Sequence, residues 1–268
     1  IKMILLTGSD GFIGKRFLNN LQKNNDVLKL EKNECFDFLS NFNYWQDIKL
    51  ILHQGAMTNT RETNKQLFNK YNFEFSIELF KKAIQYKIPI KYASSASVYG
   101  NNEKGFDPLN EYAISKLEID NWVNDNLDKF ELVQGFRYFN VYGQGEENKI
   151  ITGQASPVST FLYQAKNEGQ ITLFEGSHNF YRDFIFVDDV INLVLHNDKS
   201  SGIFDLGTSS PRSFQSIGEI ISEKMGVLIN YISFPEDLLE RYQFNTCSKQ
   251  IWDNYKFCTV EKYLNQIE

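Results

Sequence analysis

The sequence predicts an α/β fold, a doubly wound parallel sheet whose two faces are covered by helices. Strand-length apolar stretches alternate with longer amphipathic ones through most of the chain, the pattern of parallel strands joined by helical crossovers. A glycine-rich turn, residues 8–14, follows the first apolar stretch directly. Gly8, Gly55, Ser95 and Asn140 all stand where apolar stretches end. Ligands of such sheets bind at the carboxyl ends of strands, so we expect these positions to converge on one site.

The start of the chain has the context that a dinucleotide site needs. Residues 2–7 are predicted to form a buried strand, and an amphipathic helix follows the turn. The glycines allow close approach of a pyrophosphate, whose charge is attracted by the free N–H groups of the opening helix. Their spacing is G-x-x-G-x-x-G rather than the usual G-x-G-x-x-G, so a glycine turn that binds no ligand is the alternative. A second strand, residues 26–30, ends in Glu31, where an acid can hydrogen-bond an adenosine ribose.

Apolar runs and turn residues place the other elements. The polar segment 32–43 has no clear period, and we expect at most a very short strand near residues 35–38. Beyond Gly143 the chain is polar and loop-like through residue 153. The elements from 184 to 207 are expected to rejoin the main sheet. Further strands are expected at residues 48–53, 89–95, 132–138, 171–174, 184–187 and 202–207, and further helices at about 62–86, from 110, at 159–166, from 188 and at 216–225 behind a Ser213 N-cap.

One pair of residues has the spacing of an acid/base site. Tyr112 and Lys116 are four residues apart on an expected helix, so they share one of its faces. The ammonium group favours the phenolate and is expected to lower the tyrosine pKa from about 10 toward the working range. With the hydroxyl of Ser95, this trio suits proton exchange with an alcohol or carbonyl. Because such pairs also occur on many solvated helices, the catalytic interpretation depends on the dinucleotide site.

Composition excludes several classes of function. At 268 residues, 42% hydrophobic and 23% charged, the chain is expected to be globular, as one large domain or two closely associated ones. A net charge of −6 argues against bulk binding to nucleic acid or to an anionic membrane. No apolar run is long enough for a bilayer, and no signal peptide is visible. Three cysteines without metal-ligand spacing and three scattered histidines predict no metal site and a cytoplasmic protein with reduced thiols.

Several motifs together resemble the extended short-chain dehydrogenase/reductase family. They are Gly8-x-x-Gly11-Phe12-Ile13-Gly14, Ser95-Ala96-Ser97-Val98-Tyr99-Gly100, Tyr112-x-x-x-Lys116, residues 136–143 and Arg182-Asp183-Phe184. Within that family, the sequence is most similar to the enzymes that invert C6 of an ADP-linked heptose. The motifs for this are His53-Gln54-Gly55-Ala56, Leu173-Phe174-Glu175-Gly176-Ser177, Arg212-Ser213-Phe214-Gln215, and Phe234-Pro235 before Arg241-Tyr242-Gln243.

The resemblance implies a Rossmann-type dinucleotide-binding domain and a smaller α/β substrate-binding domain. We expect the first to comprise residues 1–143 and 184–211, and the second residues 144–183 and 212–268. Positions that bind the cofactor in the family are matched by Gly8, Gly11, Phe12, Ile13, Gly14, Glu31, Lys32, Gln54, Gly55, Ala56, Met57, Thr58, Asn72, Lys116 and Val141. Positions that bind the substrate are matched by Ser95, Asn140, Lys149, Phe174, Glu175, Gly176, Ser177, Arg182 and Tyr242.

The resemblance also implies two acid/base residues. Tyr112 is the first, Lys116 lowers its pKa, and Ser95, rather than Ser94 or Ser97, binds the substrate hydroxyl. Inverting a carbon without an acidic proton requires its hydrogen to leave as hydride and return to the other face of a transient ketone. Each face needs its own proton partner, and Lys149 matches a second acid/base lysine. The alternative for Lys149 is a solvated loop lysine.

Two arginines are candidates for holding a substrate diphosphate. Arg182 and Arg241 can each form bidentate hydrogen bonds to phosphate oxygens. For Arg182, the alternative is a structural ion pair with Asp183 or Asp188.

The cofactor and partners follow from the resemblance. It implies NADP. NAD is the alternative, because the Glu31 carboxylate would repel a 2′-phosphate, although the charge of Lys32 could offset that repulsion. It further implies a nucleotide-sugar substrate, a role in lipopolysaccharide core biosynthesis and a homo-oligomer, a homopentamer. Two departures from the pattern are the short segment between Glu31 and Asp47 and the Ile150-Ile151-Thr152 that follows Lys149.

Two rival functions remain open. The first is another nucleotide-sugar enzyme, a 4-epimerase or a 4,6-dehydratase. A dehydratase would need acidic residues just after Ser95, where Ala96 and Ser97 stand. The second is a dinucleotide-sensing regulator that has lost the chemistry, which would be expected to lack Tyr112 or Lys116.

Overall fold

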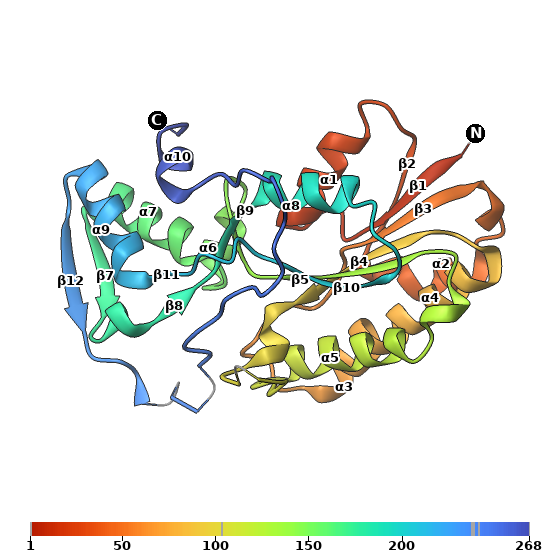
Figure 1. Cartoon of the computed structure of the whole chain (residues 1–268), viewed down its shortest axis with the longest axis horizontal. Coiled ribbons are helices and arrows are strands. Elements are labelled where there is room, and N and C mark those ends of the chain that lie inside the picture. Colours follow the sequence, from red (N-terminus) through yellow and green to blue (C-terminus); the bar gives the residue numbers. More distant parts are fainter. Residues whose placement is uncertain (1, 103, 237–238, 241, 268) are drawn as a thin grey trace. The chain divides into compact units, whose positions relative to one another are not determined.

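The computed structural model describes the whole chain except residues 1, 103, 237–238, 241 and 268 (Figure 1). The candidate cation Arg241 therefore lies outside the described residues. The chain forms two compact units, each assembled from three segments. Unit 1 comprises residues 1–98, 110–137 and 191–204, and unit 2 comprises residues 99–109, 138–190 and 205–268. Which unit binds cofactor and which binds substrate stays a prediction.

Unit 1 is built on a six-stranded sheet in the order β10-β5-β4-β3-β1-β2. Parallel pairs join β1 to β2, β1 to β3 and β3 to β4, as the alternating pattern predicted. The strands are β1 (Met3–Thr7), β2 (Val27–Leu30), β3 (Ile48–His53), β4 (Ile90–Ser95), β5 (Val133–Tyr138) and β10 (Gly202–Leu206). The helices are α1 (Phe12–Leu21), α2 (Cys35–Asn41), α3 (Lys65–Phe68), α4 (Phe75–Tyr86), α5 (Glu111–Asn124) and the second half of α8 (Val187–His196).

Helices cover both faces of this sheet. Figure 1 shows α1 on one face and α2, α4 and α5 on the other. The core on the second face packs strand residues Leu5 and Ile51 against Phe80 of α4 and Ile119 of α5, all at most 2% exposed. The strand order reverses at β1, so the carboxyl ends of β1 and β3 flank the point where doubly wound sheets bind ligands.

Two predictions about the positions of strands were wrong. The strand expected near residues 35–38 is the helix α2, because Cys35 and Leu39, one turn apart, are both buried in the core. Residues 184–187 do not join the main sheet. The position beside β5 is taken by β10, so β9 (Phe184–Phe186) pairs instead with β6 (Asn140–Tyr142). β10 does join the sheet, as expected.

Unit 2 contains, in its described residues, three two-stranded sheets with helices packed on them. β6 and β9 pair in parallel, as do β7 (Gln170–Phe174) and β12 (Leu228–Ile232), whereas β8 (Tyr181–Arg182) and β11 (Arg212–Ser213) are antiparallel. The helices are α6 (Glu147–Ile151), α7 (Pro157–Asn167), α9 (Phe214–Met225), α10 (Val260–Leu264) and the first half of α8. The segment expected to be a loop through residue 153 thus contains the short helix α6.

Helix starts in both units lie where the sequence predicted them, near Asn110 and behind the Ser213 cap. Asn110 caps α5 by accepting a hydrogen bond from the N–H of Ala113 at 2.9 Å. Ser213 caps α9 by accepting from the N–H of Ser216 at 3.1 Å. These short polar side chains satisfy N–H groups that a helix leaves without internal partners, so both predicted starts are confirmed.

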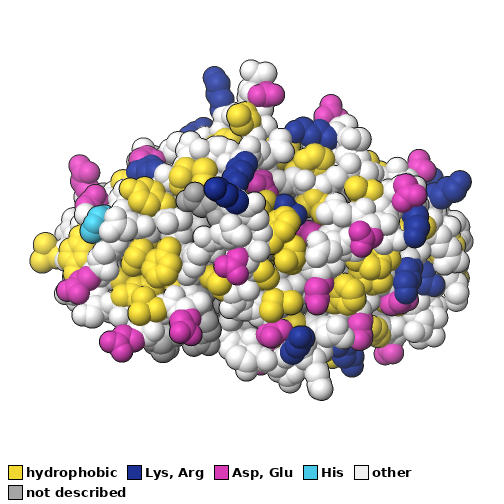
Figure 2. Space-filling view, turned by 60° about the horizontal axis from the view of Figure 1, so that its bottom comes forward, with side chains coloured by type: hydrophobic (Ala, Val, Ile, Leu, Met, Phe, Trp, Pro, Cys, Tyr) yellow, Lys and Arg dark blue, Asp and Glu magenta, His cyan; other side chains and the backbone are white. Residues whose placement is uncertain are grey.

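The helix lengths, the surface charges and the metal-ligating side chains bear on membrane, nucleic-acid and metal binding. Among the described residues, none of the helices combines the length and apolar character needed to cross a bilayer. On the face seen in Figure 2, Lys and Arg side chains are interspersed with Asp and Glu. Within the same described residues, no three His, Cys, Asp or Glu side chains gather as a metal site would need.

Candidate active site

The turn requires glycine at Gly8 and Gly14, because backbone segments approach each other closely there. Gly8 has a φ of +69°, and a Cβ added there would lie 2.5 Å from the Cα of Gly55. A Cβ on Gly14 would lie 1.9 Å from the carbonyl oxygen of Gly8. Gly11, the N-cap residue of α1, has no side chain with which to cap the helix, so no cap of its own competes with a ligand there. The turn is therefore shaped for an anion such as a pyrophosphate.

Glu31 lies beside this turn at the end of β2. Its Oε1 accepts hydrogen bonds from the hydroxyl of Ser9 at 2.7 Å and from the N–H of Asp10 at 3.1 Å. The ammonium group of Lys32 lies 4.3 Å from the ring centre of Tyr71. The carboxylate is thus held next to the glycine turn, as a contact with an adenosine ribose requires, and Lys32 is held nearby.

A buried chain of hydrogen bonds fixes the backbone of Gly55. The N–H of Gly55 donates to the Thr7 hydroxyl at 2.9 Å, and that hydroxyl lies 2.7 Å from Nδ1 of His53. Nε2 of His53 lies 2.8 Å from the hydroxyl of Ser76, which donates to the carbonyl oxygen of Asn72. Burial lowers the pKa of His53 to about 3, so the ring is neutral. The Ser76 donor direction then places the ring proton on Nε2 and makes Nδ1 the acceptor.

Asn72 holds the segment that follows β3. It lies in a π-helical segment, Asn69–Glu74, between α3 and α4, and such segments recur at functional sites. Its Oδ1 accepts from the N–H of Met57 at 2.8 Å, and its Nδ2 donates to the Met57 carbonyl at 3.0 Å and to the Ser115 hydroxyl at 3.0 Å. Ser115 in turn donates to the carbonyl of Tyr112 at 2.7 Å. Asn72 therefore ties the predicted cofactor segment to α5.

The structure brings together Ser95 and Tyr112, from β4 and α5. Their side chains are close enough to interact, and Ser95 Oγ accepts from the N–H of Ser97 at 3.2 Å. Lys116 donates to the carbonyl of Ala93 at 2.7 Å, with its ammonium 5.9 Å from the Tyr112 ring centre. The three predicted groups in unit 1 are thus neighbours.

The expectation about the Tyr112 pKa was wrong for the protein as the structure describes it. Burial raises the pKa of Tyr112, the interaction with Ser95 lowers it, and the negative charge of Asp120 raises it further. Burial also lowers the pKa of Lys116 to about 8, with Asp120 opposing. Sequence spacing correctly gives the shared helix face, but it does not reveal how far that face is withdrawn from water.

Asp120, which no sequence motif indicated, is 0% exposed and contacts the strands beside this group. Its Oδ2 accepts from the Ser94 hydroxyl at 2.9 Å and from Nε of Arg137 at 2.8 Å, and its Oδ1 accepts from the Tyr92 hydroxyl at 2.9 Å. Asp120 therefore anchors α5 to β4 and β5 and occupies the Ser94 hydroxyl. The available signal was its position four residues after Lys116, which places it on the same helix face.

Lys149 belongs to unit 2, on the short helix α6. Its side chain is half-buried, and burial lowers its pKa while Glu146 opposes the change. Its backbone N–H donates to the Glu146 carbonyl at 2.8 Å, and its own carbonyl accepts from the N–H of Gln154 at 2.8 Å. Lys149 is therefore set in an ordered turn, which differs from the solvated loop lysine that was the alternative.

Arg182 is 6% exposed and is surrounded by neutral groups among the described residues. It donates to the carbonyls of Tyr181 and Phe244, and its guanidinium carbon lies 5.3 Å from the ring centre of Tyr242. Burial lowers the pKa of Arg182 to about 10. The Asp183 carboxylate instead accepts from the N–H groups of Thr208, Ser209 and Ser248. Asp183 is therefore engaged by other donors, which argues against an ion pair between Asp183 and Arg182. The other alternative, an ion pair with Asp188, stays a prediction.

The other predicted substrate positions lie around the end of β7 and in β6. Phe174 packs against Phe234 with ring centres 5.1 Å apart, and the N–H of Glu175 donates to the Ile232 carbonyl at 2.8 Å. Gly176 has a φ of +80° and starts the turn that carries Ser177. The Ser177 hydroxyl is buried without a hydrogen-bond partner among the described residues. Asn140 and Val141 are half-buried in β6.

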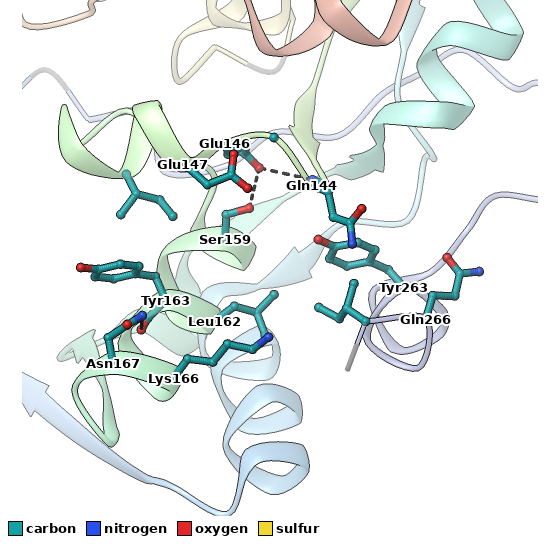
Figure 3. Close-up of a pocket in the computed structure, with 14 residues that line it drawn as sticks. Gln144, Glu146, Glu147, Ser159, Leu162, Tyr163, Lys166, Asn167, Tyr263 and Gln266 are labelled. Atoms are coloured by element: carbon teal, nitrogen blue, oxygen red, sulfur yellow. Dashed lines mark hydrogen bonds between the residues drawn. The ribbon is translucent and has the colours of Figure 1, made fainter. Parts of the chain in front are cut away.

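Two pockets lie within unit 2. One, of about 990 Å³, is lined by Phe139, Tyr181 and thirteen other residues, and it contains none of the predicted substrate residues. The other, of about 640 Å³, is lined by residues of the loop before α6 and of α7 and α10 (Figure 3). Figure 3 shows Glu146 at its edge, hydrogen-bonded to Ser159.

The sequence profile of the NAD dependent epimerase/dehydratase family matches residues 4–205. The chain is 37% identical over 280 residues to the ADP-L-glycero-D-manno-heptose-6-epimerase of Brachyspira hyodysenteriae, which covers 90% of this chain and 87% of that protein.

Solved structures are similar over nearly the whole length. The ADP-L-glycero-D-manno-heptose-6-epimerase of Helicobacter pylori has a TM-score of 0.79 and 26% identity, covering 99% of this chain and 94% of that one. A UDP-N-acetylglucosamine 4-epimerase from Methanobrevibacter ruminantium, in complex with UDP-N-acetylmuramic acid, has a TM-score of 0.82 and 18% identity, covering 98% and 97%. The second likeness concerns the fold alone.

Proposed function

Because this chain belongs to the NAD dependent epimerase/dehydratase family, we propose that it inverts C6 of the heptose in ADP-D-glycero-D-manno-heptose, giving the L-glycero isomer. The observation that carries the proposal is the 37% identity to an epimerase of that name over 90% of the chain. The neighbouring side chains of Ser95 and Tyr112 supply the local chemistry that such a reaction needs.

The residues of unit 1 fit a bound dinucleotide. The Gly8–Gly55 approach leaves a cradle that any side chain would fill, and the first turn of α1 presents N–H groups to a pyrophosphate. Glu31 and Lys32 would hold the adenosine ribose, and Lys32 would offset the charge of a 2′-phosphate, which supports NADP over NAD. When bound, the nicotinamide supplies the acceptor for the hydrogen that leaves C6 and the donor that returns it.

Tyr112 and Ser95 act on the oxygen of the reacting carbon. The phenol exchanges the hydroxyl proton as the alcohol becomes a ketone, and the Ser95 hydroxyl holds the same oxygen by hydrogen bonding. Lys116, fixed by the Ala93 carbonyl with its ammonium 5.9 Å from the Tyr112 ring centre, is the proposed contact to the cofactor ribose. The ketone then turns its other face, and Lys149 is the proposed proton partner there.

Arg182 is the proposed partner of the substrate diphosphate. A cation that is 6% exposed and has neutral partners among the described residues gains strongly from an anion in reach. The unpaired Ser177 hydroxyl and the ring of Tyr242 are candidates for contacts with the same substrate. These roles, the cytoplasmic location and the homopentamer expected from the resemblance all stay predictions.

The test is a direct assay of inversion. Purified protein is incubated with ADP-D-glycero-D-manno-heptose, and the configuration at C6 is followed by proton NMR, with UDP-glucose and UDP-N-acetylglucosamine as competing substrates. Conversion of the heptose alone supports the proposal. Inversion at C4 of a UDP-sugar without heptose conversion would replace it with the 4-epimerase alternative, and binding of cofactor without any conversion would favour a regulator.

A further inference from the structure

Glu146 is a buried carboxylate that the sequence analysis did not single out. It is 2% exposed and accepts four hydrogen bonds within unit 2. Its Oε1 accepts from the N–H of Gly143 at 3.3 Å and from the hydroxyls of Ser156 and Ser159, each at 2.7 Å. Its Oε2 accepts from the N–H of Ser156 at 2.7 Å. A buried charge is tolerated because all of these donors compensate its lost hydration.

The four bonds join the two ends of the segment that carries Lys149. Gly143 precedes α6, whereas Ser156 and Ser159 follow it and begin α7. Figure 3 shows the Glu146 carboxylate facing Ser159, while its neighbour Glu147 takes no part in the marked bonds. Glu146 is also the N-cap residue of α6, and its carbonyl accepts from the N–H of Lys149 at 2.8 Å. One residue thus closes the loop around α6 through both its side chain and its backbone.

We propose that Glu146 is a positioning residue that holds α6, and with it the side chain of Lys149, in the geometry required for the second proton transfer. This inference rests on the proposed function of Lys149. A five-residue helix is too short to be stable alone, so its orientation must be imposed by tertiary contacts. Glu146 supplies four of them.

The size of the effect follows from geometry. Misplacing a reacting group by about 1 Å can cost roughly 100-fold in rate. Gln at this position cannot accept from both the Ser156 N–H and the Gly143 N–H, because one of its two terminal atoms is a donor. We expect Glu146→Gln to lower kcat for C6 inversion by roughly 10- to 100-fold with little change in KM. Glu147→Gln, the exposed neighbour, is the matched control and should leave kcat unchanged.

A double-mutant cycle separates positioning from general destabilisation. In a Lys149→Ala background, measured as single turnovers with enzyme in excess, Glu146→Gln should slow the reaction by no more than roughly twofold. If Glu146→Gln costs the same factor with and without Lys149, it does not act through Lys149 and the proposal fails. Ser159→Ala removes one bond and leaves the carboxylate in place, so it gives a milder loss in the same direction should Glu146→Gln fold poorly.

Hydrogen exchange supplies a readout that does not depend on activity. Amides of residues 147–156 should exchange faster in Glu146→Gln than in wild type, while peptides of the six-stranded sheet stay unchanged. Unchanged exchange at 147–156 would overturn the proposal whatever the enzyme does. If the wild type fails to invert C6, the proposed function falls, and the exchange measurement still decides whether Glu146 holds α6.

Discussion

The phenol of Tyr112 lies beside the hydroxyl of Ser95 and interacts with it, although the first comes from the helix α5 and the second from the end of β4. The contact depends on residues that do no chemistry themselves. Asp120 joins α5 to Ser94 and Tyr92 of β4, and Ser115 joins the backbone of Tyr112 to Asn72. The acid/base pair is thus held at its helix and at its strand by buried polar contacts.

Replacing the phenol tests its role as acid/base group. Tyr112→Phe should lower kcat for C6 inversion by roughly 100- to 10,000-fold, because the proton transfer is lost while the ring remains. Cofactor affinity, measured by fluorescence titration, should change little. Full turnover by Tyr112→Phe would assign the chemistry to another residue.

Removing the second base tests the two-base scheme. Lys149→Ala should reduce C6 inversion strongly, because one face of the ketone would then lack its proton partner. Lys166→Ala, a lysine of the same unit on α7, serves as the control and should retain turnover. If Lys149→Ala keeps full activity while Tyr112→Phe abolishes it, the scheme is wrong.

The close approach of Gly8 to Gly55 can be tested by measuring the free energy of unfolding. Gly8→Ala should destabilise the protein by more than the roughly 1–2 kcal/mol expected for forcing alanine into a left-handed conformation, because its Cβ would also meet Gly55 at 2.5 Å. Gly169→Ala is the matched control, since Gly169 has the same φ of +69° and nothing within 4 Å of the added Cβ. Urea unfolding measures both variants. Equal losses would show that the contact with Gly55 is unimportant.

His53 predicts a pH dependence of stability. The folded ring stays neutral down to about pH 3, whereas the unfolded ring takes up a proton near its ordinary pKa of 6.5. Below pH 6.5 the unfolded state therefore binds more protons, and stability falls as the pH falls. At pH 5 this loss should be about 2 kcal/mol relative to pH 7.5, and His53→Asn should lack it. Exposed His178, replaced by Asn, should leave the loss intact; a pH profile unchanged in His53→Asn would contradict the prediction.

The buried arginine can be tested by ligand affinity. Arg182→Lys should weaken ADP binding by roughly tenfold, because lysine keeps the charge but loses the planar stack on Tyr242 and the paired donors. Arg212→Lys, which alters a half-exposed pair with Glu261, is the control. Calorimetry gives both constants. An Arg182→Lys protein that binds ADP as tightly as wild type would exclude a diphosphate contact at this position.

Much of the fold follows from local sequence signals. The strand at 48–53, the helix start near Asn110 and the cap at Ser213 were predicted correctly, because apolar periodicity and capping chemistry act within a few residues. The helix α2 was missed because only burial against the core distinguishes Cys35 and Leu39 from a strand. β9 was assigned to the wrong sheet because β10 competes for the edge of β5.

The candidate site was likewise predictable only in part from local sequence patterns. Helical spacing placed Tyr112 beside Lys116, and the glycine turn placed the cradle. The roles of Asp120 and Glu146 depend on partners far along the chain or across a turn, and the raised pKa of Tyr112 depends on burial, neither of which a local pattern contains.

Running the reaction in D2O tests most directly whether C6 is inverted by removal and return of its own hydrogen. Wild-type protein with ADP-D-glycero-D-manno-heptose should give the L-glycero isomer, and NMR should find protium retained at C6, because the hydrogen never becomes a solvent proton. Deuterium at C6 of the product, or no inversion with cofactor bound, would contradict the account.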